Sequence, residues 1–347
     1  RSDTLTGAFD TLTTGDAECK HGTQNINGES LTLDGKEFFY TREFAHDFSD
    51  VKGQNIAKRA ALIAAAGMHN ILMEGSPGCG KSMIAKRLRY ILPPMSVDEI
   101  LKFAMLDFLE GKESDFSAKR PFRSPHNNST RSALLGGGSK EGQIGEVALS
   151  SGGILWLDEL PHFDKTLIEG LREPLENYRI LISRVNSKID YDADFMFVGS
   201  MNPCPCGNLL SKTKECRCKE SEIQRYKNRL SEPFLDRMDI FVQMEEFSEA
   251  GKSDITSNEM FDNVIKAFSA QMKRGGKLNS RLSDKELAGL EITDEATDML
   301  QKAGARFAMS ARSSAKTLKV ARTIADLENS IKVEKPHILE ALSYRKR

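Results

Sequence analysis

The residues Gly75 to Ser82, GSPGCGKS, match the phosphate-binding pattern G-x-x-x-x-G-K-[ST]. The glycines allow backbone N–H groups to surround phosphate oxygens, and a following helix adds partial positive charge at its N-terminus. We expect Lys81 to reach the β- and γ-phosphates of a nucleotide and Ser82 to bind Mg²⁺. A chance match in a glycine-rich turn is the alternative. The apolar run HNILMEG before the motif and the helical pattern MIAKRLRYIL after it argue against chance.

An acidic pair follows a second apolar run. The residues at 154–157, ILWL, lead directly into Asp158 and Glu159. Such a run predicts a buried strand that presents two carboxylates at its end. Asp158 would hold the Mg²⁺ shell, and Glu159 would polarise an attacking water. The alternative is a strand followed by the acidic first turn of a helix, which is common. The phosphate-binding motif upstream favours the metal and water roles.

A third apolar run, FMFVGSMN, ends at Asn202. The carboxyl ends of parallel strands meet in one crevice of an α/β sheet. A neutral amide there can orient a water between Glu159 and the γ-phosphate. The alternative is an ordinary strand-ending asparagine before Pro203. The two preceding motifs favour the catalytic role.

Four of the six cysteines follow Asn202 closely. Cys204, Cys206, Cys216 and Cys218 form the pattern C-x-C, nine residues, C-x-C. Four thiolates suffice for a tetrahedral Zn²⁺ site, although the spacing differs from the usual C-x-x-C pair. Reduced, unliganded thiols and a regulatory disulfide are the alternatives. Cys79 lies inside the phosphate-binding motif, where we expect only a small spacer.

The order of the periodic segments predicts an α/β fold. Strands alternate with helices up to about residue 248, and from about residue 254 every periodic stretch is helical. This order predicts an α/β domain at 45–248 followed by a helical domain at 249–347. Residues 1–44 are polar with little periodicity, so we expect a linker or the remnant of a missing N-terminal domain.

Composition indicates a globular protein without a membrane segment. Charged residues make up 29% of the 347 and hydrophobic residues 39%, with a formal net charge of -1. A nucleic-acid contact would therefore need a local basic patch. No apolar run approaches the roughly 18 residues of a membrane helix, and RSDTLTGAFD has no signal core. We expect a cytoplasmic protein with reduced thiols.

In these motifs the chain resembles the ComM/YifB family of magnesium-chelatase-like AAA+ ATPases, from about residue 45 to 347. The resemblance also rests on RPFRSPH, GGGSKEGQIGEVALSSGGILWLDELPHF, MNPCPCGN, RLSEPFLDRMDI and SARSSAKTLKVARTIADLE. It implies a P-loop αβα domain with a pre-sensor-1 hairpin and a helix-2 insert, followed by a helical lid. Family members resemble ring-forming hexameric motors that use ATP and Mg²⁺. Those studied on nucleic acid act as DNA branch-migration helicases in natural transformation.

The resemblance assigns further roles by motif. Asn202 corresponds to the sensor-1 residue, Arg237 in FLDRMD to the arginine finger that reaches a neighbouring subunit, and Arg312 in SAR to the sensor-2 arginine. A guanidinium fixed at a transferring phosphoryl group is worth about 10³–10⁵ in rate. Without the resemblance, both arginines would be read as surface salt-bridge residues. Val51 and Gly53 lie where family members hold the adenine. The resemblance places the nucleotide phosphates on Gly75, Ser76, Pro77, Gly78, Cys79, Gly80, Lys81, Ser82 and Met83.

The segment ILISRVNSKIDYDADF resembles the pre-sensor-1 hairpin, with Arg184 and Lys188 near its tip. In a hexamer, six copies would line a pore and bind DNA phosphates without reading bases. An ordinary solvated tip is the alternative. The irregular stretch 121–146 resembles the helix-2 insert. Its basic residues are Arg123, Arg131 and Lys140.

Two features depart from the family pattern. His126 is followed by Asn127 where members usually have a second histidine. Full-length members also carry an N-terminal Lon-protease-like domain, and we expect residues 1–44 to be its remnant or linker. The leading hypothesis is an ATP-hydrolysing homo-hexameric motor on DNA, acting in recombination during natural transformation. A chelatase-type remodeller of a protein partner is the first alternative. A non-hydrolysing nucleotide- or zinc-dependent binding module is the second, and Glu159 and Arg237 argue against it.

Overall fold

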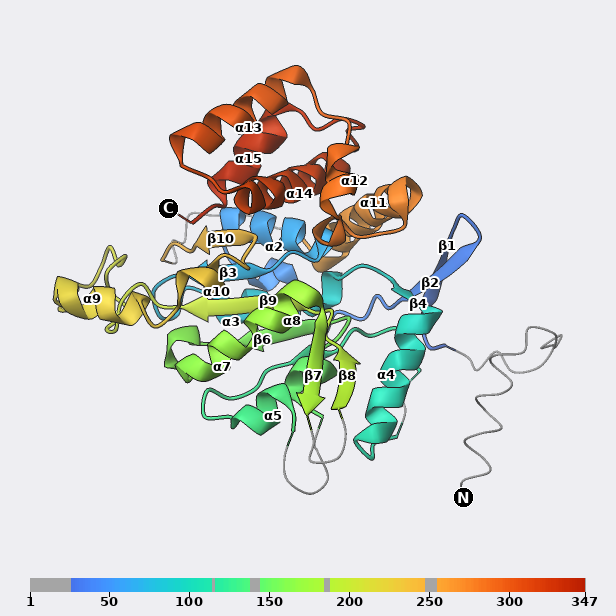
Figure 1. The fold of residues 1–347 in the computed structure, drawn as a ribbon, viewed down its shortest axis with the longest axis horizontal. Coiled ribbons are helices and arrows are strands. Elements are labelled where there is room, and N and C mark those ends of the chain that lie inside the picture. The colour runs from blue at the N-terminus through green and yellow to red at the C-terminus, as the bar shows by residue number, and fades with distance from the viewer. Residues whose placement is uncertain (1–25, 114–115, 138–143, 184–187, 247–254, 347) are drawn as a thin grey trace.

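The computed structural model describes residues 26–113, 116–137, 144–183, 188–246 and 255–346. Its centre is a parallel five-stranded sheet with the strand order β10-β3-β9-β6-β5, shown in Figure 1. In chain order the strands are β3 (Ile71–Glu74), β5 (Phe122–Arg123), β6 (Ile154–Leu157), β9 (Met196–Met201) and β10 (Ile240–Gln243). The apolar runs of the sequence are therefore neighbouring strands of one sheet.

Helices cover both faces of this sheet because alternate residues of a strand point to opposite sides. Ile71 and Met73 belong to a hydrophobic core that includes residues of α2 (Asn55–Gly67) and α3 (Lys81–Leu88). Leu72, between them, belongs to a second core on the other face. That second core includes residues of α5 (Arg131–Leu135), α6 (Glu146–Leu149), α7 (Lys165–Gly170) and α8 (Arg172–Asn177). The three-layer αβα arrangement predicted from the sequence is confirmed.

The stretch 121–146 is more regular than its composition suggests. β5 pairs in parallel with β6, with Phe122 opposite Ile154, and so forms the edge of the central sheet. The helices α5 and α6 follow it. A two-residue strand is too short to show a period, which is why the sequence did not reveal it.

Part of the expected linker is a folded hairpin. β1 (Glu29–Leu33) and β2 (Lys36–Tyr40) pair antiparallel, and β2 also pairs with β4 (Met95–Ser96). The Phe38 ring meets the Phe268 ring edge-on at 5.0 Å. Residues 29–40 therefore pack on the helical region. Whether residues 1–44 are a linker or the remnant of an N-terminal domain stays a prediction.

The second hairpin has the predicted form. β7 (Arg179–Ser183) pairs antiparallel with β8 (Lys188–Asp192), and Ser183 lies opposite Lys188 in the register. In Figure 1 this hairpin extends away from the central sheet, beside α4 (Val97–Leu109). The tip that joins the strands, including Arg184, lies outside the described residues.

The C-terminal region is helical, as predicted. It contains α11 (Ser257–Gly275), α12 (Asp284–Ala288), α13 (Asp294–Arg306), α14 (Ala311–Leu327) and α15 (Lys335–Ser343). Both α11 and α14 pack on α2, so this lid shares a hydrophobic core with the sheet domain. Among the described residues, no helix is both long enough and apolar enough to span a membrane.

Candidate functional site

The phosphate-binding loop joins β3 to α3 at the carboxyl edge of the sheet. Gly78 and Gly80 have φ angles of +81° and +99°, which side chains rarely tolerate. Lys81 is buried, and its Nζ donates to the carbonyl oxygens of Gly75 at 2.6 Å and Ser76 at 3.1 Å. The ammonium group therefore lies within the loop, the position from which the motif's lysine reaches phosphates.

The parallel strand ends bring the predicted polar residues together. β3 pairs with β9 and β9 with β6, so their carboxyl ends share one edge. Lys81 Nζ donates to Asn202 Oδ1 at 3.1 Å, across 121 residues of sequence. Ser82 Oγ donates to Asp158 Oδ2 at 3.0 Å, across 76 residues. The hydroxyl and carboxylate oxygens of this second pair fit the ligand preference of Mg²⁺, and they lie beside the phosphate loop.

Ser200 is a site residue that the sequence analysis missed. Its hydroxyl donates to Asp158 Oδ1 and accepts the N–H of Glu159 at 3.1 Å. The same N–H lies 3.0 Å from Asp158 Oδ1. Ser200 thus holds both acidic residues. Strand alternation could have revealed it, because residues two apart, such as Ser200 and Asn202, point to the same side of a strand.

Glu159 combines an unusual backbone with an accessible carboxylate. Its φ angle is +52°, a left-handed conformation that costs a non-glycine residue free energy and is typical of functional sites. The residue is exposed. Within the described structure no hydrogen bond or ion pair joins its carboxylate. The Glu159 carboxylate is therefore available to accept a proton from water.

The two predicted catalytic arginines meet at Glu176 of α8. Arg237, which follows α10 (Glu232–Leu235), forms a short ion pair with Glu176, and Arg312 Nη1 lies 2.9 Å from Glu176 Oε1. Partial burial acts to raise the pKa of Glu176, but the two guanidinium groups hold it below its usual value. Among the described residues, neither arginine hydrogen-bonds to Lys81 or Asn202. Both arginines therefore bond to Glu176 and, in the described structure, form no hydrogen bond with the phosphate loop of the same chain.

Lys316 of α14 ties the lid to the turn that carries Arg237. Its Nζ donates to the Asp236 carbonyl at 2.5 Å and lies 3.3 Å from Asp239 Oδ1. Asn70, just before β3, donates through Nδ2 to the Arg237 carbonyl at 3.0 Å. Burial acts to raise the pKa of Asp239, but Lys316 and other donors around it hold that pKa well below its usual value. The orientation of the Arg237 turn is thus set jointly by the lid and the sheet.

We expect Lys316→Met to lower the kcat for ATP hydrolysis about tenfold with little change in the KM for ATP. The long apolar side chain keeps the packing of α14 but removes the contacts to the Arg237 turn. Lys319→Met is the matched control, since Lys319 is on the same helix and donates instead to the Ser280 carbonyl at 3.1 Å. Steady-state kinetics on folded samples of both variants, checked by circular dichroism, measure the effect. Equal kcat values for the two variants would contradict a specific role of Lys316.

The residues expected around the adenine come just before α2 in the chain. Val51 is buried in the core next to α2, and Gly53 has a φ angle of +63°. Gln54, which the sequence analysis did not select, donates to the carbonyl oxygens of Cys79 at 3.0 Å and Glu245 at 2.6 Å. Gln54 therefore links the chain before α2 to the phosphate loop, and the adenine role of Val51 and Gly53 stays a prediction.

The four clustered cysteines have the geometry of a metal site. The Cys204 sulfur lies 3.4 Å from that of Cys206 and 3.7 Å from that of Cys216, and the Cys206 and Cys216 sulfurs are 3.7 Å apart. All four sulfurs, with Cys218, lie within 4.8 Å of one another. Tetrahedral Zn²⁺ with Zn–S bonds near 2.3 Å places sulfurs about 3.8 Å apart. The donor set and spacing fit this ion.

The cysteine loop also touches the phosphate loop. A Cβ added to Gly207 would lie 2.5 Å from Pro77 Cδ, so only glycine allows this approach. The backbone N–H groups of Asn208 and Arg217 lower the pKa of Cys206 to about 6. One thiolate is therefore available at neutral pH, and a metal bound there would brace the loop that leaves β9 against the nucleotide site.

The predicted DNA contacts are placed only in part. Lys188 begins β8, and Arg184 and Lys140 lie outside the described residues. Arg123 Nε lies 2.5 Å from Glu146 Oε2. That ion pair compensates the charge of Arg123, and its contact with DNA stays a prediction. Arg131, at the start of α5, is exposed.

Comparison with known proteins places the chain in the family that its motifs resemble. Residues 47–251 match the family model "Magnesium chelatase, subunit ChlI", and residues 254–345 match that of the ChlI C-terminal region. The chain is 41% identical to the competence protein ComM of Haemophilus influenzae over 86% of its length and 60% of the relative's. It is 39% identical to the uncharacterized protein YifB of Escherichia coli, over 88% and 61% of the two lengths.

A more distant similarity, 24% identity over 45% of the chain, joins it to the magnesium-chelatase 67 kDa subunit of Chlorobaculum parvum, of which it covers 23%. The chain thus spans about three fifths of the length of ComM and YifB. The family model covers the phosphate loop, the acidic pair, Asn202 and Arg237, and the C-terminal model covers Arg312. The chain belongs to the magnesium chelatase ChlI family of AAA+ proteins.

Proposed function

We propose that the chain is an ATP-hydrolysing motor that works as a homo-hexameric ring on DNA. The observation that carries the proposal is the separation of the catalytic groups. Lys81, Asn202 and Asp158 form one cluster, while Arg237 and Arg312 form another on Glu176. A site with a nucleotide loop but no arginine of its own is completed when a second copy supplies one, as in GTPases activated in trans.

Each residue of the first cluster has a distinct task in hydrolysis. Lys81 neutralises charge on the β- and γ-phosphates, and Asn202 orients the attacking water. Glu159 accepts the proton of that water as it attacks phosphorus. Ser82 and Asp158 would hold Mg²⁺, which supplies charge neutralisation on the phosphate oxygens. Ser200 holds Asp158 and Glu159 in position through its hydrogen bonds to the Asp158 carboxylate and the Glu159 N–H.

The DNA part of the proposal rests on similarity and on the β7–β8 hairpin. The matched relative is named competence protein ComM, and the resemblance to the ComM/YifB family implies a role in DNA recombination during natural transformation. In a ring, the hairpins of successive subunits would approach the central pore and place Arg184 and Lys188 on phosphates. Movement of the hairpins during hydrolysis would then pull DNA. Branch migration in recombination is the activity that fits this arrangement best.

We expect single-stranded or forked DNA to stimulate ATP hydrolysis by the intact protein several-fold. The double variant Arg184→Ala/Lys188→Ala should lose that stimulation but keep the hydrolysis rate measured without DNA, because neither residue belongs to the nucleotide cluster. Phosphate release with and without DNA measures both rates. If DNA neither binds to the protein nor stimulates its ATP hydrolysis, the proposed DNA motor is rejected.

That outcome would instead favour a chelatase-type motor that remodels a protein partner. The observation in its favour is the match to the ChlI family and to the magnesium-chelatase 67 kDa subunit. Added partner protein would then stimulate hydrolysis where DNA does not.

We also propose that the cysteine cluster holds a structural Zn²⁺. Metal analysis of the purified protein should find about one Zn per chain, because the four sulfurs match one tetrahedral site. Cys216→Ser should lower both the zinc content and the melting temperature. Cys19→Ser is the control, since Cys19 is far in sequence from the C-x-C pairs at 204–218. A zinc content below about 0.2 per chain in wild type would reject the site.

A further inference from the structure

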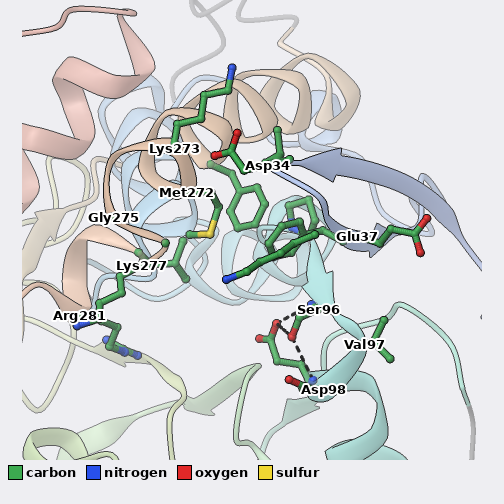
Figure 2. A pocket seen from close by; sticks show the side chains of 18 of the residues that line it. Asp34, Glu37, Ser96, Val97, Asp98, Met272, Lys273, Gly275, Lys277 and Arg281 are labelled. Atoms are coloured by element: carbon green, nitrogen blue, oxygen red, sulfur yellow. Dashed lines mark hydrogen bonds between the residues drawn. The ribbon is translucent and has the colours of Figure 1, made fainter. Parts of the chain in front are cut away.

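One pocket of the described structure is lined by basic and neutral polar side chains alone. Its volume is about 590 Å³, and its lining residues are Lys165, Ser221, Gln224, Arg225, Asn228 and Arg229. A different cavity, of about 1080 Å³ and shown in Figure 2, has a lining of mixed charge. There Lys273 and Lys277 share the lining with Asp34, Glu37 and Asp98. The smaller pocket therefore carries positive charge without an acidic residue in its lining.

The pocket is built on one face of α9 (Glu220–Lys227). Ser221, Gln224 and Arg225 follow the i, i+3, i+4 spacing that places side chains on the same side of a helix. The opposite face is fixed, because Ile223 and Tyr226 are buried. Lys165, the first residue of α7, supplies a further cation from a distant part of the chain. Figure 1 shows α9 at the outer end of the molecule, far from the β7–β8 hairpin.

The charges of this pocket are largely uncompensated. In the described parts of the chain, no carboxylate oxygen lies within 4.0 Å of the charged nitrogens of Lys165, Arg225 or Arg229. Asp164 is an acidic neighbour of Arg229, but its carboxylate accepts hydrogen bonds from Thr166 N at 2.7 Å and Oγ1 at 2.6 Å. Glu169 also acts electrostatically on Lys165. An added anion would therefore meet three cations that form no ion pair within the described structure.

The basic character extends along the sequence on either side. Residues 212–229 contain seven lysines and arginines against three glutamates, a formal charge of +4 in a chain of net charge -1. Zn²⁺ on four thiolates would add -2 and leave the segment positive. A positive patch on a chain that is otherwise near neutral marks a local site for a polyanion.

We propose that this pocket and the basic segment around it bind the phosphodiester backbone of a nucleic acid, as a second contact remote from the β7–β8 hairpin. The proposal rests on the proposed action on DNA. The lining has no aromatic side chain on which a base could stack, so the contact is to phosphates. It also has no apolar side chain, whereas a protein partner would bury an apolar centre. Nucleic acid is therefore favoured over an acidic protein.

Arg225→Gln/Arg229→Gln tests the proposal in the intact protein. Binding of a labelled oligothymidine is measured by fluorescence anisotropy over a range of salt concentrations. Each lost phosphate contact on a single strand should reduce the slope of log K against log salt by about 0.7, so the double variant should lose about 1.4. Hydrolysis of ATP without DNA should be unchanged, because neither arginine touches the nucleotide cluster.

Lys285→Gln/Arg306→Gln is the matched control. It removes the same two charges from exposed positions of the lid and should keep the wild-type slope. An unchanged slope in the α9 variant would overturn the proposal, and so would a loss of assembly by sedimentation, which would assign this face to a subunit contact. If wild type itself binds no DNA at any salt concentration, the proposed DNA motor fails as well.

Discussion

Replacing Arg237 with alanine is expected to lower the kcat for ATP hydrolysis by about 10³-fold or more. In the described structure Arg237 forms no hydrogen bond or ion pair with the phosphate loop of its own chain, and its guanidinium bonds to Glu176 and to the Pro233 carbonyl. Binding of ATP should therefore be nearly unchanged. Single-turnover hydrolysis and equilibrium binding of a fluorescent ATP analogue separate the two quantities.

A mixing experiment shows whether Arg237 acts on a neighbouring subunit. Arg237→Ala subunits keep a complete nucleotide cluster, and Lys81→Ala subunits keep the arginine. If Arg237 acts in trans, a mixture of the two inactive variants should regain hydrolysis at the interfaces where the intact parts meet. A mixture of Lys81→Ala with Glu159→Gln is the control and should stay inactive, because both defects lie on the nucleotide side. No recovery in the first mixture would contradict catalysis across subunits.

Glu159→Gln is the second variant with a large expected effect. The amide keeps the shape of the side chain but cannot take a proton from water, so kcat should fall by about 10²–10⁴. Affinity for ATP should remain, because Lys81, Ser82 and Asp158 are intact. Phosphate release and nucleotide binding on the same sample measure the two effects.

Glu295→Gln on the exposed first turn of α13 is the control for that variant and should keep full activity. Full hydrolysis by Glu159→Gln would remove Glu159 from catalysis. It would then favour the alternative in which the chain binds nucleotide without hydrolysing it.

Local patterns account for the parts of the fold that were predicted correctly. The runs that became β3, β6 and β9 are buried on both faces, so they read as continuous apolar segments. The hairpin β1–β2 was missed because half of its strand residues are exposed and its burial comes from contacts with distant residues, such as Phe38 with Phe268 and Tyr40 with Phe261. Such long-range contacts leave no local period in the sequence.

The same distinction applies to the site. Lys81, Ser82, Asp158 and Asn202 were found because a parallel sheet brings the ends of neighbouring strands to one edge. Ser200 was missed, although its position two residues before Asn202 places it on the same side of β9. The sequence motif identified Arg237, but it did not predict that Arg237 forms an ion pair with Glu176.

The sequence by itself determined the nucleotide-binding chemistry, because the phosphate motif, the acidic pair and the cysteine cluster are short segments whose geometry follows from their own residues and the strands before them. Only the tertiary structure decided where the two arginines lie. Glu176 of α8, Arg237 of the turn after α10 and Arg312 of α14 come from three separate segments, and their meeting depends on how α14 of the lid docks on the sheet domain. Contacts between segments that are distant in sequence depend on tertiary packing, which the sequence of one segment does not specify.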